Sequence, residues 1–326
     1  MSIRKLATLV TGFMLLLPAT GPASERLIRV GVLEFGTVNW ELDVINHHQL
    51  DQKAGFSLEI TRLGSKNATA VALQSGAVDM IVTDYIWVAR QRTRGSELVF
   101  YPHSNALGAV MVNPRANIAS LSDLAGRELG IAGGPVDKSW LLLQAYHRQQ
   151  GGDNLADILE PRFAAPPLLN KLVERGDLPA ALNFWHYSAR LSAQGMQQLL
   201  SMREVLESLG IERRVAMIGW VFDENWARKN LSLVNAFLDA MRDAKRLLND
   251  SDDEWKRLAP MVRSENEPML NALRDAYREG IPSSFNEQDR AAAINLYSIL
   301  AELGGQQLVG NAREIPAGLF WRERDF

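Results

Sequence analysis

The chain has 326 residues, of which 47% are hydrophobic and 22% are charged, and its formal net charge is −3. Such values are ordinary for a globular protein, and a chain of this length can bury the cores of two domains. The small negative charge, without any visible basic face, argues against a nucleic-acid partner. No cysteine is present, which excludes disulfides, thiolate metal sites and cysteine nucleophiles.

The N-terminal segment, residues 1–23, has the pattern of an export signal. A basic pair at positions 4 and 5 is followed by the apolar run 6–17, and small residues at 21–23 offer a cleavage site. The apolar run is too short to persist as a membrane anchor. We therefore expect residues 1–23 to be removed and the mature protein to be periplasmic. A buried N-terminal helix is the alternative, but nothing amphipathic supports it.

From residue 27 onward, short apolar strands alternate with helices. Strands are expected in "LIRVGVLEF", "FSLEITRLG", residues 78–82, "ELVFYPHSN" and "ALGAVMVNP". Ser65 is a candidate N-cap of a helix whose core face is expected to carry Ala68, Val71, Ala72 and Ser75. Thr83 or Asp84 can cap the next helix. This repetition predicts a mostly parallel sheet with helices on both faces.

The same pattern begins again in "SLSDLAGRELGIAGG". A helix with Pro135 near its first turn follows, and then "PPLLNKLVERGDLPAALNFWHY" repeats the order of helix, strand and polar strand end. The apolar face of that helix is expected to consist of Leu168, Leu169, Leu172 and Val173. "RVAMIGWVFDENWARKN" indicates one more strand, and helices are expected to continue to about Gly304. The first of these helices is expected to bury Val234, Phe237, Leu238, Met241 and Leu248 on its core face. Residues 305–326 have weak periodicity and are expected to form a tail on the surface.

Three short motifs occur in a fixed order along the chain. They are Ser75-Gly76-Ala77-Val78-Asp79, then "DLAGRELGI" from Asp123, and then Glu174-Arg175-Gly176-Asp177 before a strand that ends near Trp185. With these motifs the chain resembles the periplasmic solute-binding proteins of the nitrate/sulfonate/taurine (NitT/TauT) class of ABC importers. The resemblance covers about residues 28–248, and it depends on the order and spacing of the motifs.

The resemblance implies an α/β protein with the two-lobed periplasmic-binding-protein fold (type II-like). Lobe one is expected to comprise residues 24–108 and 219–326, including a helical C-terminal part, and lobe two residues 109–218. Two crossing strands, near residues 107–112 and 217–221, are expected to form the hinge. The implied partners are a small-molecule ligand held between the lobes and an ABC permease in the inner membrane, and the protein is expected to be a monomer.

Candidate ligand-binding residues lie where the strands are expected to end, because ligands of open α/β sheets bind beyond the carboxyl ends of strands. They are Gly36, Thr37, Trp40, Ser65, Asp84, Tyr85, Gly134, Trp185 and His186. Asp84 can orient a donor on the ligand or simply cap a helix. Trp40 and Trp185 can stack on a ligand or pack in a core. Tyr85 and Trp87 cannot both face a cleft from one helical turn.

The polar groups near these strand ends suit an anion only in part. Ser65 and the N–H groups that follow it fit an anionic group at a helix start, although plain capping needs no ligand. Lys66 and Lys138 would help to bind an anion, but such side chains are more often solvated.

Metal binding, cofactor binding and catalysis are not expected. His47 and His48 diverge by about 100° on a helix and cannot chelate one ion well. "GGPVDKS" lacks the ending of a phosphate-binding loop, and no nucleophile elbow occurs. The resemblance to the NitT/TauT class then implies a protein that binds a small polar organic or anionic solute, such as a sulfonate-, taurine- or nitrate-like ion or a planar heteroaromatic compound.

Two other classes of function stay open. One is an enzyme on the same fold, similar to the pyrimidine synthases of thiamine biosynthesis or to menaquinone-pathway lyases, although the export signal argues against a cytoplasmic enzyme. The other is an accessory protein that docks on a periplasmic enzyme.

We expect the mature protein to begin near Ser24 and to be found in the periplasmic fraction. N-terminal sequencing of protein purified from its own cells tests this expectation. An intact Met1 on soluble cytoplasmic protein would contradict the export signal.

Overall fold

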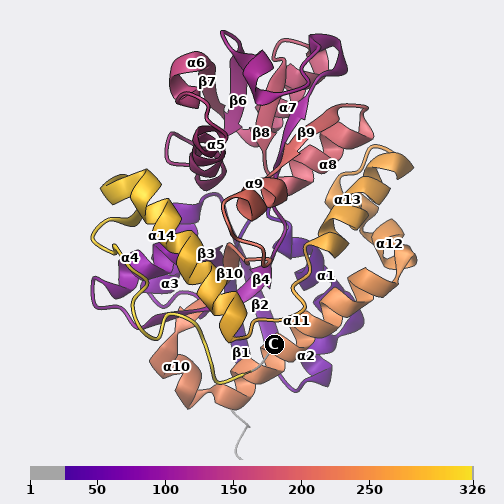
Figure 1. Cartoon of the computed structure of the whole chain (residues 1–326). Helices are drawn as coiled ribbons and strands as arrows, with labels where there is room; N and C mark the ends of the chain where they lie inside the picture. Colours follow the sequence, from indigo (N-terminus) through magenta and orange to yellow (C-terminus); the bar gives the residue numbers. More distant parts are fainter. Residues whose placement is uncertain (1–25, 325–326) are drawn as a thin grey trace, which may run out of the picture.

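The computed structural model describes residues 26–324, so the expected export signal lies outside the described part. The chain forms two five-stranded sheets with the orders β2-β1-β3-β10-β4 and β7-β6-β8-β5-β9. We call the part built on the first of these sheets the first lobe and the part built on the second sheet the second lobe. In Figure 1 the first lobe lies below the second lobe. Within residues 26–324, no helix has both the length and the apolar character that a membrane crossing requires.

The first lobe combines the N-terminal strands with the C-terminal helices. Its strands are β1 (Leu27–Leu33), β2 (Ser57–Leu63), β3 (Met80–Asp84), β4 (Leu98–Ser104) and β10 (Ile218–Asp223). Its helices are α1 (Val38–His48), α2 (Leu50–Lys53), α3 (Lys66–Gln74), α4 (Tyr85–Arg92), α10 (Glu224–Lys229), α11 (Leu231–Asp250), α12 (Asp252–Val262), α13 (Glu267–Glu279) and α14 (Glu287–Val309). Strand β10 runs antiparallel to both β3 and β4, whereas β1 is parallel to β2 and β3.

The second lobe is continuous in sequence. Its strands are β5 (Ala109–Val112), β6 (Glu128–Ala132), β7 (Glu160–Ala164), β8 (Ala180–Asn183) and β9 (Gln197–Ser201). Its helices are the short 3-10 turns η1 (Pro114–Ala116) and η2 (Leu121–Leu124), with α5 (Lys138–Gln149), α6 (Leu155–Ile158), α7 (Pro166–Arg175), α8 (Trp185–Ala193) and α9 (Met202–Ser208). Strand β5 is antiparallel to β8 and β9, so each sheet contains one reversed strand.

Two crossings join the lobes, and each leads into the reversed strand of a sheet. Residues 105–108 connect β4 to β5, and residues 209–217 connect α9 to β10. A Cβ atom on Gly108 would overlap the carbonyl oxygen of Asn183, and one on Gly219 would overlap that of Tyr101. Both glycines are therefore required by the close approach of neighbouring backbone at the points where the chain enters a sheet.

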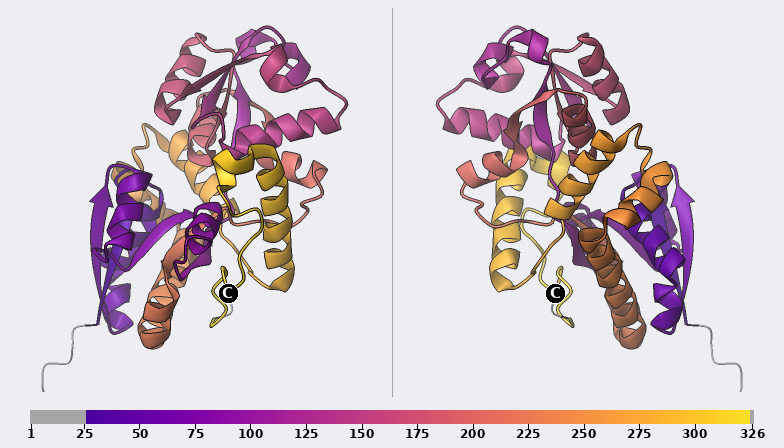
Figure 2. Two further views of the ribbon diagram at one scale, coloured as in Figure 1. Left: turned by 90° about the vertical axis from the view of Figure 1, so that its left-hand side faces the viewer. Right: turned by 90° about the vertical axis from the view of Figure 1, so that its right-hand side faces the viewer.

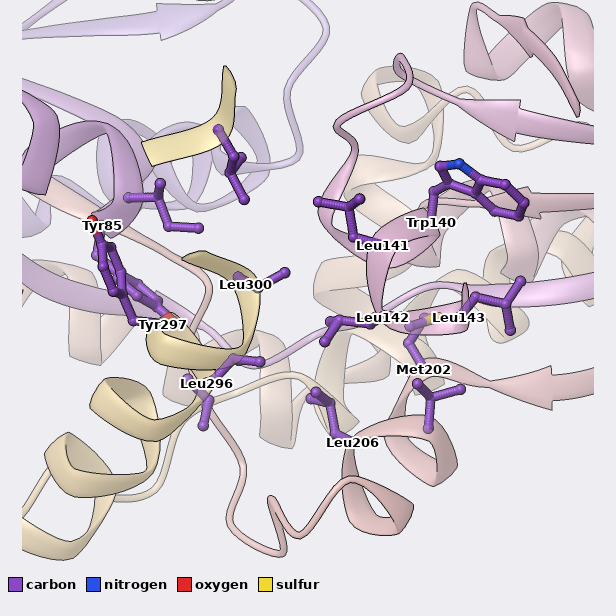
Figure 3. Close-up of a cluster of buried hydrophobic side chains, with 14 of the residues drawn as sticks. Tyr85, Trp140, Leu141, Leu142, Leu143, Met202, Leu206, Leu296, Tyr297 and Leu300 are labelled. Carbon is purple, nitrogen blue, oxygen red and sulfur yellow. The ribbon is translucent and has the colours of Figure 1, made fainter. Parts of the chain in front are cut away.

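The lobes touch on both sides of the crossings. Helix α14 contacts α5 on one side, and α13 contacts α8 on the other (Figures 1 and 2). A buried apolar cluster runs from Leu296 and Leu300 of α14 to Leu141 and Leu142 of α5 (Figure 3). The hydrophobic core is therefore continuous from one lobe to the other.

Several local expectations are confirmed. Ser65 caps α3, where its hydroxyl accepts a hydrogen bond from the Ala68 amide at 3.1 Å. The residues expected to form the core face of α11, which are Val234, Phe237, Leu238, Met241 and Leu248, are all buried.

Other expectations are wrong. The core face of α3 is formed by Thr69 and Leu73, whereas Val71 is 62% exposed. On α7, Leu168 is half exposed, because Leu169 and Val173 make the contact with the sheet.

The ends of several segments also differ from expectation. Helix α5 begins at Lys138 rather than near Pro135, and the segment after β10 turns into α10 at Glu224. The C-terminal stretch is not a surface tail: Leu319, Phe320 and Trp321 are buried, and Phe320 pairs with Phe100 of β4. Tertiary pairing at the exposed edge of β4 outweighs the weak local periodicity of this stretch.

We expect Gly108→Ala to lower the free energy of unfolding by about 1–3 kcal/mol, because the added methyl group forces the β4–β5 crossing away from β8. Gly64→Ala is the control, since a Cβ atom there meets nothing within 4 Å, and its effect should stay below about 0.5 kcal/mol. Urea unfolding of both variants measures the difference. Equal effects would show that Gly108 is not constrained.

Candidate functional site

A cleft of about 710 Å³ opens between the lobes. The first lobe contributes the loop after β1 and the start of α1, with Gly36, Thr37 and Trp40 in the wall. The second lobe contributes His186 and Tyr187 from α8. Four of the sequence-predicted residues, Gly36, Thr37, Trp40 and His186, are thus brought together across the cleft. Its volume is within the usual range of pockets for small ligands.

Two tryptophans join the lobes beside this cleft. The rings of Trp40 and Trp185 meet edge to face, with centroids 5.9 Å apart. Trp40 is buried and also packs on Trp255 and Tyr277. Trp185 lines a different cavity, of about 450 Å³, at the crossing segments. The sequence left open whether these rings stack on a ligand or pack in a core. In the structure both rings pack against other side chains, and Trp40 also lines the cleft.

The cleft wall contains polar atoms without a protein partner. Burial lowers the pKa of His186 to about 3, so its imidazole is neutral at physiological pH, and its Nδ1 atom has no hydrogen-bond partner among the described residues. The Nδ2 of Asn39 donates to the carbonyl oxygens of Leu33 and Gly36, while its Oδ1 is buried and equally unpartnered. Asn39 was not predicted from the sequence, because its hydrogen bonds are to backbone carbonyl oxygens of the turn after β1, and they form only when that turn is folded.

An ion pair connects the lobes at a second group of predicted residues. The Lys138 ammonium, at the start of α5, donates to the Asp84 carboxylate at 3.1 Å. Asp84 lies at the end of β3 and also accepts the Trp87 amide at 2.9 Å, which confirms its role as the cap of α4. Lys138 was expected to be solvated and is instead paired and mostly buried.

Opposed effects determine the charge state of this pair. Burial acts to raise the pKa of Asp84, but Lys138 and Lys66 together with the Trp87 amide hold the pKa below its ordinary value. Burial acts to lower the pKa of Lys138, and the carboxylates of Asp84 and Asp137 raise it overall. Both groups are therefore charged at neutral pH.

Three helix starts converge on this ion pair. Ser65 and Lys66 begin α3, Asp84 caps α4, and Asp137 caps α5 by accepting the amides of Ser139 and Trp140. Gly134 belongs to the loop before α5, and a side chain there would meet nothing within 4 Å. The region thus combines two ammonium groups, two carboxylates and the positive ends of helix dipoles.

Tyr85 does not belong to either group. Its ring is completely buried against Phe100 and Phe320, and its hydroxyl donates to the Ala293 carbonyl at 3.4 Å. We expected that Tyr85 and Trp87 could not both face a cleft, and Tyr85 is the one that lies in the core. We remove Tyr85 from the candidate site.

Arg190 is a cleft residue that sequence reasoning missed. Its guanidinium extends from α8 of the second lobe and donates to the carbonyl oxygens of Val262 and Arg263 in the first lobe. Nothing in the local sequence indicates this contact, because it depends on how the lobes face each other. For residues 26–324, no group of three or more histidine, aspartate or glutamate side chains could hold a metal ion.

Comparison with known families identifies the class of the chain. The profile of the family described as NMT1/THI5 like matches residues 52–251. The chain therefore belongs to the NMT1/THI5-like family. A comparison with the sequences of curated proteins gives no match.

Solved structures with a similar fold include proteins that bind sulfonates or nitrate. The alkanesulfonate-binding protein SsuA from Xanthomonas axonopodis pv. citri, bound to MOPS, superposes with a TM-score of 0.68 at 17% identity, covering 92% of this chain and 100% of that one. The aliphatic sulphonate binding protein SsuA from Escherichia coli gives 0.67 at 17% identity, with 89% and 97% covered. The nitrate-binding protein NrtA from Synechocystis PCC 6803 gives 0.58 at 11% identity, with 91% and 92% covered. The expected two-lobed periplasmic-binding-protein fold is confirmed.

We expect Lys138→Met to lower the free energy of unfolding by about 1–3 kcal/mol at pH 7, because it leaves the Asp84 carboxylate without its partner. The difference from the parent should narrow as the pH falls below 3.8 and through the lowered pKa of Asp84, since the pair stabilises the parent only while Asp84 is ionised, and protonation in the variant removes the unpaired charge. Urea unfolding at pH 7 and at the lowest pH at which the parent stays folded measures both values.

Lys171→Met is the control, because Lys171 forms an exposed pair with Glu174 at 2.9 Å within one helix. Its effect should stay below about 0.5 kcal/mol at either pH. A Lys138→Met effect as small as the control, or one that does not change with pH, would contradict the role of the pair.

Proposed function

We propose that the protein captures a small polar organic or anionic solute between its lobes in the periplasm and delivers it to an ABC permease. The observation that carries the proposal is the Asp84–Lys138 pair, which joins opposite lobes where three helices begin. We also propose the lobe bounds given above, residues 24–108 with 219–326 and residues 109–218, and a monomeric protein.

The charged groups suit a solute with both an anionic group and a donor. An anionic group can replace the Asp84 carboxylate as partner of the Lys138 ammonium, with Lys66 and the free N–H groups at the start of α3 nearby. A donor on the same solute can then bond to the released Asp84. Such an exchange keeps every buried charge paired, so the cost of breaking the ion pair is offset.

The cleft wall suggests what the rest of the solute is like. Phe35 and Met261 line the cleft and are exposed, so an apolar part of the solute can bury surface against them. The unpartnered nitrogen of His186 and the Oδ1 of Asn39 can orient a polar group. Proteins that share this fold bind sulfonates or nitrate, and by analogy with them we infer a small anion as the substrate class.

An enzyme of the same family is the competing function. Native mass spectrometry of the protein purified from its own periplasm distinguishes the two, because a binding protein retains an unmodified solute. Incubation with the identified solute should leave its mass unchanged. A product formed from that solute would favour the enzyme, and a co-purifying protein without a small ligand would favour the accessory role.

For the identified solute, we expect Asp84→Asn to weaken binding by about tenfold to a hundredfold, or roughly 1.5–3 kcal/mol, because a charged hydrogen bond in a part-buried site between the lobes is lost. Trp185→Ala should cost a similar amount, because Trp40 and the cleft wall lose their packing partner. Calorimetric titration measures the affinities, and melting curves separate them from changes in stability.

Asp223→Asn is the matched control. Asp223 caps α10 by accepting the Trp226 amide at 2.9 Å, as Asp84 does for α4, but it lies at the other end of the sheet. Asp84→Asn should lower the melting temperature more than Asp223→Asn, because it also leaves the Lys138 ammonium without its partner, and only Asp84→Asn should change the affinity. If both variants bind like the parent, the solute lies elsewhere.

A further inference from the structure

A separate cavity of about 370 Å³ lies in the first lobe, between the β4–β10 edge of its sheet and helix α11. It shares no lining residue with the cleft between the lobes. Its walls are largely apolar and include Trp220 of β10 with Leu238 and Met241 of α11. The volume suffices for a small organic molecule.

The charged side chains that line this cavity are all cationic. They are Arg242, Lys245, Arg246 and Arg278, and none of the lining residues within 26–324 has a carboxylate side chain. Their acidic partners, Asp239, Glu41, Asp243 and Asp252, lie outside the lining. The pairs of Arg242 and Arg246 are on the exposed surface of α11, where such pairs contribute little and rearrange easily. An anion in the cavity would therefore meet a positive field at a small cost in broken pairs.

Two buried nitrogen atoms in the same walls lack partners. Trp220 is 1% exposed, and its Nε1 donor has no acceptor among the described residues. Buried indole N–H groups usually find one, as Trp255 does when it donates to the Leu248 carbonyl at 2.8 Å. Trp321 also lacks an acceptor, but it does not line this cavity.

His103 provides the second atom. Its Nε2 lies 3.6 Å from Glu41, and its Nδ1 has no partner in the described part of the chain. Burial lowers the pKa of His103 to about 4, so the ring is neutral at physiological pH and offers the cavity a hydrogen-bonding group without a charge.

We propose that this cavity is a second binding site, and that it takes a small organic anion whose apolar part lies against Trp220 while its anionic group faces Arg242, Arg246 and Arg278. The proposal does not depend on the solute of the cleft. Four cations without a lining carboxylate select the charge, and the apolar walls select against hydrated inorganic ions.

The test uses 2-naphthalenesulfonate as the probe, followed by the indole ¹H–¹⁵N resonances of the protein. The Trp220 resonance is assigned as the one that is missing from Trp220→Phe, and the resonance of Trp40, which lines the cleft, as the one missing from Trp40→Phe. We expect the probe to shift the Trp220 resonance and to leave the Trp40 resonance in place. The shift then reports binding at the cavity rather than in the cleft.

Arg246→Glu should weaken probe binding by about tenfold, because it replaces an attractive charge with a repulsive one. Lys256→Glu is the matched control: both side chains pair with an aspartate three residues earlier, and their exposed fractions are 67% and 69%. It makes the same change in net charge, so its affinity should stay within about twofold of the parent. Melting curves confirm that both variants are folded.

An unchanged Trp220 resonance would overturn the proposal, and a shift of the Trp40 resonance alone would place the probe in the cleft instead. Equal affinities of the Arg246→Glu and Lys256→Glu proteins would also overturn it. They would show that the probe responds to the net charge of the protein and not to the side chains that line the cavity.

Discussion

The apolar packing of α14 against α5 holds the two lobes together (Figure 3). Leu296 and Leu300 belong to the same buried cluster as Leu141, so separating the lobes at this contact would expose them to water. Each such side chain contributes roughly 1.5–3 kcal/mol when it is fully buried. Gly304 permits the approach, because a side chain there would press on Leu308 and Leu141. Any movement that pulls α14 away from α5 therefore costs free energy.

The proposed function sets what a solute would have to do at the ion pair. It would have to replace the Asp84–Lys138 pair, which contributes about 1–3 kcal/mol as a part-buried charged interaction. A solute that pairs only one of the two charges would leave the other buried and alone, at a cost of a similar size. Under the proposed function, the ion pair would therefore select solutes by their charge pattern, which the apolar contact between α5 and α14 cannot do.

The features that the sequence predicted correctly are those that depend on interactions between residues close together in the chain. The caps at Ser65 and Asp84 and the core face of α11 were predictable, because capping and helical periodicity act within one or two turns. The core face of α3 was not, because Val71 and Leu73 are both apolar and only the packed sheet decides between them.

The errors in the site have a different cause. The Asp84–Lys138 pair joins residues 54 positions apart on different lobes, and no local pattern encodes that approach. The burial of Tyr85 depends on Phe320 from the far end of the chain, and the same pairing places the C-terminal stretch in the core instead of on the surface. The sequence therefore identified the strand ends, and the tertiary structure decided which of their side chains meet.

One buried carboxylate links the two binding regions. Glu41 accepts hydrogen bonds from the Lys245 ammonium at 2.8 Å and from the Tyr277 hydroxyl at 2.6 Å. It follows Trp40 in α1, so these bonds fix the helix that carries one wall of the cleft. Lys245 also lines the cavity in the first lobe. Because a buried charge that loses its partner is costly, the Lys245 ammonium stays with Glu41, and the anion proposed for that cavity would be held by the more exposed Arg242 and Arg246. The same cavity wall thus contains one ammonium group that holds α1 in place and two guanidinium groups whose partners exchange at little cost.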